Sequence, residues 1–207
     1  MTITDSDVDT YQSAVSDFVP QIKPDGCYPT AIKNIIDELA ERKEIDGISL
    51  SLSDVNDLCN YREGMYTEEE IIPEAVSREV SEFGYQAVEA SAPDMDFSEL
   101  QRIIENPETS LPVVELDPEY FGQVENYRVQ GREEASHTVI VFKINSDKVL
   151  YYDPYEKFFE QSSRIDEAPY EWQKTDFYEL WSGRYDERWA FWLEPRDQSL
   201  LNQFGVQ

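Results

Sequence analysis

Residues 21–35 read QIKPDGCYPTAIKNI, in which an extended segment gives way to a helix. Pro20 and Pro24 bracket the extended part, because proline and the residue before it avoid helical backbone angles. Pro29 suits the first turn of a helix, where the amide that proline lacks would have no intrahelical partner. We therefore expect a helix to begin close to Cys27.

The predicted helix has one apolar face. Its apolar residues recur at helical spacing from Ala31 to Leu39. A stripe of this kind is typical of a helix that packs against a core. The polar residues between the apolar positions, Asn34 among them, are expected to face solvent.

Shorter helices are predicted to follow in the first half of the chain. Ser53 can cap one that continues through Leu58. Thr67 begins another, whose leading glutamates suit a helix N-terminus and which Gly84 ends. Residues 97–104, FSELQRII, form a third, so the first half of the chain is expected to be mainly helical.

The second half changes to a strand pattern. Residues 111–117 (LPVVELD) indicate a buried strand, and residues 137–144 with 148–153 predict an antiparallel hairpin around a polar turn. A short helix over 175–181 and a last strand over 188–195 follow. This order predicts an α+β fold with a helical first lobe and an antiparallel β-sheet second lobe.

Length and composition predict one folded domain over residues 1–207, with 1–14 as a polar lead-in and 196–207 as a tail. No stretch of the sequence reaches the eighteen or so apolar residues needed to cross a bilayer, and the acidic N-terminus does not resemble a signal peptide. No basic patch occurs, which argues against nucleic-acid binding. We expect a cytoplasmic protein with no membrane partner.

Charge is the strongest global signal, with 44 Asp and Glu against 17 Lys and Arg and a net charge of −27. Self-repulsion on this scale destabilises a compact state unless salt screens it. The acids are spread along the whole chain, which favours a halophilic protein whose acidic surface holds hydrated monovalent cations. A rival interpretation is an acidic recognition surface for a basic partner, which would more often be a local block.

Cys27 is the first candidate for chemistry. The dipole and the unpaired amides of a helix N-terminus favour a thiolate, and Asp25-Gly26 allows the chain to turn and present the sulfur. Cys59 is the other cysteine, and we interpret it as a core residue. The two cysteines lack metal-ligand spacing, so neither a metal site nor a cofactor is predicted.

His137, the only histidine, starts one strand of the predicted hairpin, and Asp153 ends the other. Counting back from the turn places the two nearly opposite, within about a residue of register. Cross-strand neighbours approach closely enough for a carboxylate to orient an imidazole. The alternative is a surface histidine in a salt bridge beside an Asp-Pro turn.

Gln21 precedes Cys27 by six residues, and its side-chain amide together with the Cys27 backbone N–H could stabilise an oxyanion.

These segments resemble the bacteriocin-processing, double-glycine-leader cysteine peptidases of the papain-like superfamily and their stand-alone relatives. The resemblance rests on QIKPDGCYPTAIKNI, on HTVIVFKINSDKVLYYDPY and on TDFYELWSGRYDERWAFWLEP, and covers roughly residues 15 to 195. It implies a papain-like fold with Gln21 in the oxyanion hole and Cys27 as nucleophile. It also implies His137 as general base and acid, with Asp153 orienting it.

The sequence departs from this family at Tyr28, where members commonly have glycine, so the double-glycine preference is not carried over. The leading hypothesis is a cysteine peptidase that cleaves a peptide or protein substrate through an acyl-thioester intermediate. One alternative is a catalytically silent papain-like module that binds peptides or proteins. Another is a thiol acyltransferase of transglutaminase-like type, which passes the acyl group to an amine.

Overall fold

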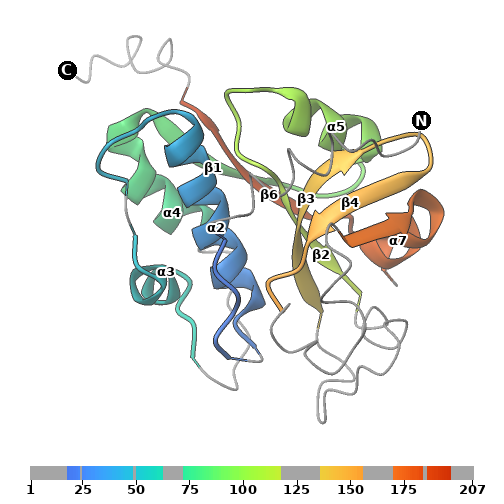
Figure 1. The fold of residues 1–207 in the computed structure, drawn as a ribbon, viewed down its shortest axis with the longest axis horizontal. Helices are drawn as coiled ribbons and strands as arrows, with labels where there is room; N and C mark the ends of the chain where they lie inside the picture. Colours follow the sequence, from blue (N-terminus) through green and yellow to red (C-terminus); the bar gives the residue numbers. More distant parts are fainter. Residues whose placement is uncertain are drawn as a thin grey trace.

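A computed structural model describes residues 18–23, 25–48, 50–62, 72–117, 136–155, 170–183 and 186–196. Its centre is a six-stranded antiparallel sheet in the order β1-β6-β2-β3-β4-β5 (Figure 1). The strands are β1 Tyr85–Ala90, β2 Val113–Leu116, β3 His137–Ile144, β4 Lys148–Tyr152, β5 Tyr170–Gln173 and β6 Ala190–Pro195. The helices are α2 Cys27–Arg42, α3 Leu52–Leu58, α4 Ile72–Val80, α5 Phe97–Glu105 and α7 Lys174–Ser182.

The sheet divides the core into two layers, as its alternating side chains require. Helices α2, α3 and α4 lie against one face, and α5 and α7 lie against the other (Figure 1). Ile140 and Val113 belong to the α2 side, whereas Val139 and Val114 belong to the α5 side. The expected α+β fold, with a helical first lobe and an antiparallel sheet, is confirmed.

Helix α2 begins at Cys27 as predicted, and its apolar stripe is buried against β3. The expectation for Asn34 was wrong, because this side chain is fully buried. Its Oδ1 accepts from the Val19 N–H at 2.9 Å, and its Nδ2 donates to the Val19 carbonyl at 3.0 Å. Asn34 therefore ties the segment that carries Gln21 to helix α2, which explains a buried amide on an apolar face.

Two predicted helix starts differ from the structure. Helix α3 is capped by Ser51 and not by Ser53, because Ser51 and Asp54 form a reciprocal capping box. The predicted start at Thr67 lies outside the described residues, and α4 is described from Ile72. Gly84 follows the last helical turn with a φ of 85°, a conformation that glycine adopts without strain.

Sequence patterns missed the edge strands β1 and β5. β1 (YQAVEA) alternates only weakly between buried and exposed positions, and β5 has four residues, too few for a period to be recognised. Both complete the sheet by pairing, β1 with β6 and β5 with β4. The predicted hairpin of β3 and β4 is present, with an irregularity between Val141 and Lys143.

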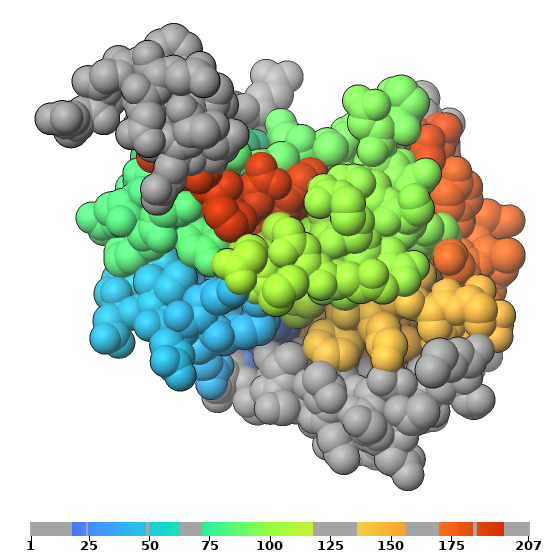
Figure 2. Space-filling view, turned by 90° about the horizontal axis from the view of Figure 1, so that it is seen from above, coloured from blue at the N-terminus to red at the C-terminus, as the bar shows by residue number. Residues whose placement is uncertain are grey.

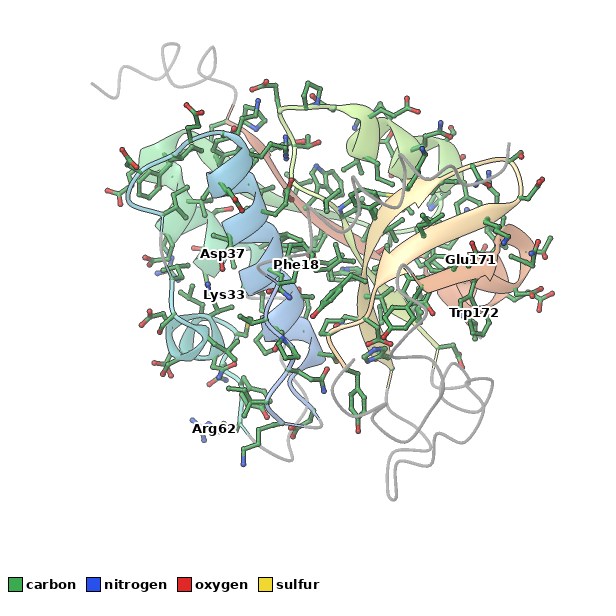
Figure 3. All side chains as sticks on the ribbon, in the orientation of Figure 1. Phe18, Lys33, Asp37, Arg62, Glu171 and Trp172 are labelled. Carbon is green, nitrogen blue, oxygen red and sulfur yellow. The ribbon has the colours of Figure 1, made fainter. Side chains whose placement is uncertain are left out.

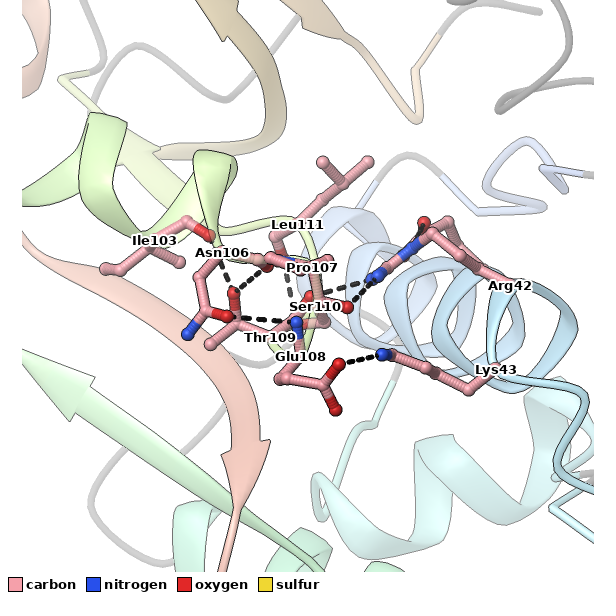
Figure 4. A network of polar contacts seen from close by, with 10 residues as sticks. Arg42, Lys43, Ile103, Asn106, Pro107, Glu108, Thr109, Ser110 and Leu111 are labelled. Atoms are coloured by element: carbon pink, nitrogen blue, oxygen red, sulfur yellow. Dashed lines mark hydrogen bonds and ion pairs between the residues drawn. The ribbon is translucent and has the colours of Figure 1, made fainter.

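A polar cluster joins the far end of α2 to the segment between α5 and β2 (Figure 4). Figure 2 shows the two parts of the chain in contact at the surface, the first in blue and the second in yellow-green. The Arg42 guanidinium donates to the carbonyls of Pro107 and Thr109, the latter at 2.7 Å. Lys43 forms an ion pair with Glu108. The Thr109 hydroxyl caps the end of α5 through the Ile103 carbonyl at 2.6 Å. These contacts join the C-terminal end of α2 to the segment between α5 and β2.

Candidate active site

The first turn of α2 presents Cys27 beside the start of β3. Cys27 is the first helical residue after Gly26, so its amide is one of the first-turn N–H groups without an intrahelical partner. Cys27 is 9% exposed, so neighbouring residues cover most of it. Asp25, two residues earlier, accepts a hydrogen bond from the Tyr61 hydroxyl at 2.5 Å. Tyr61 thus anchors the loop that precedes Cys27.

His137 and Asp153 contact each other directly, with 2.6 Å between Nε2 and Oδ1. Continuing the pairing of Ile140 with Tyr152 by one residue places Asp153 opposite Val139, two residues from His137. The predicted register was therefore out by one further residue. The contact still forms because diagonal neighbours on one face are within reach of long side chains. Both side chains are buried, at 1% and 0% exposure.

Cys27 forms a hydrogen bond with His137. Because Nε2 of the ring contacts Asp153, Nδ1 is the nitrogen left for the sulfur. Burial alone would raise the pKa of the Cys27 thiol, but the hydrogen bond and charge of His137, with smaller contributions from Thr138, lower it. Burial would lower the pKa of His137, but the charge and hydrogen bond of Asp153, followed by Cys27, raise it to about 10. Both shifts favour a thiolate–imidazolium pair.

Backbone contacts hold the acid in place. Oδ1 of Asp153 also accepts the N–H of Tyr155 at 2.9 Å, and the ring of Tyr155 meets that of His137 edge-on at 6.1 Å. Burial, followed by the negative charge available at Cys27, raises the pKa of Tyr155 to about 12. Tyr155 is buried, and it forms one wall around the imidazole.

Gln21 lies close to the loop that precedes Cys27, and its side-chain amide is partly engaged within that loop. Its side chain is fully buried, and its backbone N–H donates to the Pro154 carbonyl at 2.8 Å, which links it to the Asp153 loop. The Nε2 group donates one hydrogen bond to the Lys23 carbonyl at 2.8 Å, and Oε1 has no hydrogen-bond partner. One N–H of the amide remains for a ligand, because a primary amide carries two.

Phe18 packs against the core on the α2 side of the sheet. It lies between α2 and the sheet (Figure 3), and its ring meets Tyr152 edge-on at 5.0 Å. Lys33 and Asp37 form an ion pair on the outer surface of the helix.

Cys59, the second cysteine, is fully buried in the core, and burial raises its pKa to about 12. Its interpretation as a core residue agrees with this position.

Sequence reasoning missed three supporting residues: Thr138 next to the sulfur, Tyr61 on Asp25, and Asn34 on Val19. Only Thr138 had a usable signal, since it follows the single histidine on a strand. In the described part of the chain, no group of three His, Cys, Asp or Glu side chains could hold a metal ion. No helix described there is long and apolar enough to span a membrane.

No family model matches the sequence, and no curated protein matches it. Solved structures do resemble it. The peptidase domain of Streptococcus ComA, a bifunctional ABC transporter of a quorum-sensing pathway, is 14% identical, with a TM-score of 0.47 over 86% of this chain and 97% of that one. A protein of Bacillus anthracis described as a C39-like peptidase is 13% identical, with a TM-score of 0.55 over 88% of this chain and 96% of that one. The chain thus has the fold of the C39 papain-like peptidases.

Proposed function

We propose that this protein is a cysteine peptidase that hydrolyses peptide bonds through Cys27, His137 and Asp153. The observation that carries the proposal is the position of the His137 ring, which contacts the Cys27 thiol and the Asp153 carboxylate at once. A buried histidine between a helix-start cysteine and a carboxylate is the arrangement that activates a thiol as a nucleophile.

The reaction follows from the protonation states that the site favours. The Cys27 thiolate attacks the carbonyl carbon of the scissile amide and forms a carbon–sulfur bond. Imidazolium His137 gives its proton to the leaving nitrogen, and the carbon–nitrogen bond breaks to leave an acyl-thioester. Water then attacks the thioester while His137 takes a proton from it, and the acid is released as the thiolate–imidazolium pair returns.

Asp153 and Gln21 have supporting roles in this proposal. The carboxylate of Asp153 holds the ring and stabilises its charged form. The remaining N–H of the Gln21 amide and the backbone N–H of Cys27 are the donors available to the developing oxyanion.

The test combines labelling with product analysis. A peptidyl electrophile should label Cys27 and leave Cys59 unmodified, as read by mass spectrometry of the digested protein. A library of peptides should then yield new carboxyl and amino termini with the native protein and none with Cys27→Ala. Labelling without cleavage products would indicate the silent binding module. Products appearing only when an amine is added would indicate the acyltransferase.

A further inference from the structure

Thr138 occupies an unusual position beside the nucleophile. It follows His137 on β3 and pairs with Glu115 across β2. Because side chains alternate along a strand, Thr138 shares its face with Ile140, which packs in the core formed with α2. This places a hydroxyl on the side of the sheet that the nucleophile helix covers.

The Thr138 hydroxyl is buried, and it lacks a hydrogen-bond partner. The residue is 6% exposed, and its Oγ1 makes no hydrogen bond to the described residues. A buried hydroxyl without a partner is costly, because it has lost water and gained nothing in exchange. The same side chain and the Thr138 backbone both interact with Cys27 when its sulfur is charged.

We propose that Thr138 is a further residue of the active site, whose hydroxyl donates a hydrogen bond to the Cys27 thiolate. This inference rests on the proposed function, since it concerns the nucleophile of that reaction. A hydroxyl that is unpaired next to a neutral thiol gains an acceptor when the thiol ionises. The cost of burying the unpaired hydroxyl beside a neutral thiol is thus offset once the thiolate forms, because hydrogen bonds to a charged acceptor are stronger.

Other titratable groups surround this contact and must be separated from it. His137 contacts the sulfur from β3, and Asp153 and Tyr155 follow β4. Glu115 faces Thr138 from β2, and its pKa is raised by burial, with Ser136 hydrogen-bonded to it and Glu187 nearby. A variant of Thr138 must therefore remove the hydroxyl without changing any of these charges.

The experiment compares Thr138→Val with Thr138→Ser by following alkylation of Cys27 against pH, with the modified peptide quantified by mass spectrometry. Valine keeps the shape of threonine and suits a strand, and serine keeps the hydroxyl. With Thr138→Val we expect the thiol step to move up by about one pH unit, and alkylation below that step to slow about tenfold. Thr138→Ser should retain the native step. The melting temperature of Thr138→Val should not fall when it is measured at a pH below the thiol step, because the thiol is then neutral and the hydroxyl has no hydrogen-bond partner.

A second comparison separates a direct contact from one through the imidazole. In a His137→Ala background, Thr138→Val should still raise the thiol step. The proposal would be overturned if the alkylation profiles of the native protein and Thr138→Val coincide. It would also be overturned if the thiol step of Thr138→Ser moves as far as that of Thr138→Val, or if Thr138→Val shifts the step only when His137 is present. A different result would contradict the proposed function itself: alkylation of the native protein would then show a single step near the ordinary thiol pKa of about 8.5.

Discussion

His137 Nε2 lies 2.6 Å from Asp153 Oδ1 although the two residues stand two positions out of register across β3 and β4. The same oxygen also accepts the Tyr155 N–H, so the backbone after Asp153 fixes the direction of the carboxylate. The imidazole is therefore held from one side while its other nitrogen remains for Cys27. This geometry leads to specific expectations for reactivity.

Alkylation of Cys27 should show a plateau between two steps in pH. The lowered pKa of Cys27 means that the thiolate is lost as pH falls through a value below the ordinary one. The raised pKa of His137, to about 10, means that the imidazolium is lost as pH rises through that value. The two steps belong to the coupled pair. Iodoacetamide rates measured at each pH, with mass spectrometry of the labelled peptide, provide the profile.

His137→Ala should move the acid limb of this profile up towards the ordinary thiol value, because the cation that stabilises the thiolate is gone. Cys59 is an internal control, since its buried thiol, with a pKa of about 12, should react slowly throughout. An unchanged acid limb in His137→Ala would show that the imidazole does not activate Cys27.

Asp153→Asn should slow peptide cleavage by at least about tenfold while labelling of Cys27 remains partly intact. The amide oxygen can still accept from Nε2 and from the Tyr155 N–H, but the charge that raises the pKa of His137 is absent. Asp153→Ala should lower both the cleavage rate and the stability further than Asp153→Asn does, since it leaves two buried donors unpaired. Cleavage rates and urea unfolding of both variants provide the comparison, and equal effects on stability would contradict it.

Asn34→Ala should destabilise the fold by about 2–3 kcal/mol, because two hydrogen bonds to Val19 are lost inside the core. Urea unfolding measures the change. Asp37→Asn is the matched control on the same helix, where loss of an ion pair with Lys33 should change stability by less than about 1 kcal/mol. If the tether positions Gln21, cleavage by Asn34→Ala should fall more than its folded fraction does.

Arg42→Met should lower stability by about 1 kcal/mol, because the carbonyls of Pro107 and Thr109 lose a charged donor. Lys43→Met is the control, since its exposed ion pair with Glu108 contributes little. Thermal unfolding in the same buffer compares the two. Equal shifts of the melting temperature in the two variants would mean that Arg42 contributes only surface charge, and that its hydrogen bonds to Pro107 and Thr109 do not stabilise the fold.

Salt should stabilise this protein beyond ordinary screening. With a net charge of −27, we expect the melting temperature to rise from low salt into the molar range of KCl. Choline chloride at equal ionic strength is the control, because it screens charge but cannot place small hydrated cations among carboxylates. Full stability in low-salt buffer would argue against the halophilic interpretation and favour an acidic surface for a basic partner.

The sequence by itself determined the elements that have strong local patterns. The apolar stripe of α2, the start of that helix at Cys27 and the hairpin of β3 and β4 follow from side-chain periodicity and turn residues. Four candidate residues were also named from spacing and from the scarcity of cysteine and histidine. The short or weakly alternating strands β1 and β5 carry no such period, and they form only because the sheet offers them partners.

Only the tertiary structure decided how the site is held together. Burial of Asn34 contradicts its polar character and is explained by Val19, fifteen residues away in sequence. The register of His137 against Asp153 depends on an irregularity in the hairpin, and the sequence has no pattern that predicts it. The role proposed for the unpaired hydroxyl of Thr138 depends on helix α2, which covers that face of the sheet and brings Cys27 next to it. Local patterns reflect the backbone preferences of neighbours in sequence, whereas contacts between distant segments depend on how those segments pack.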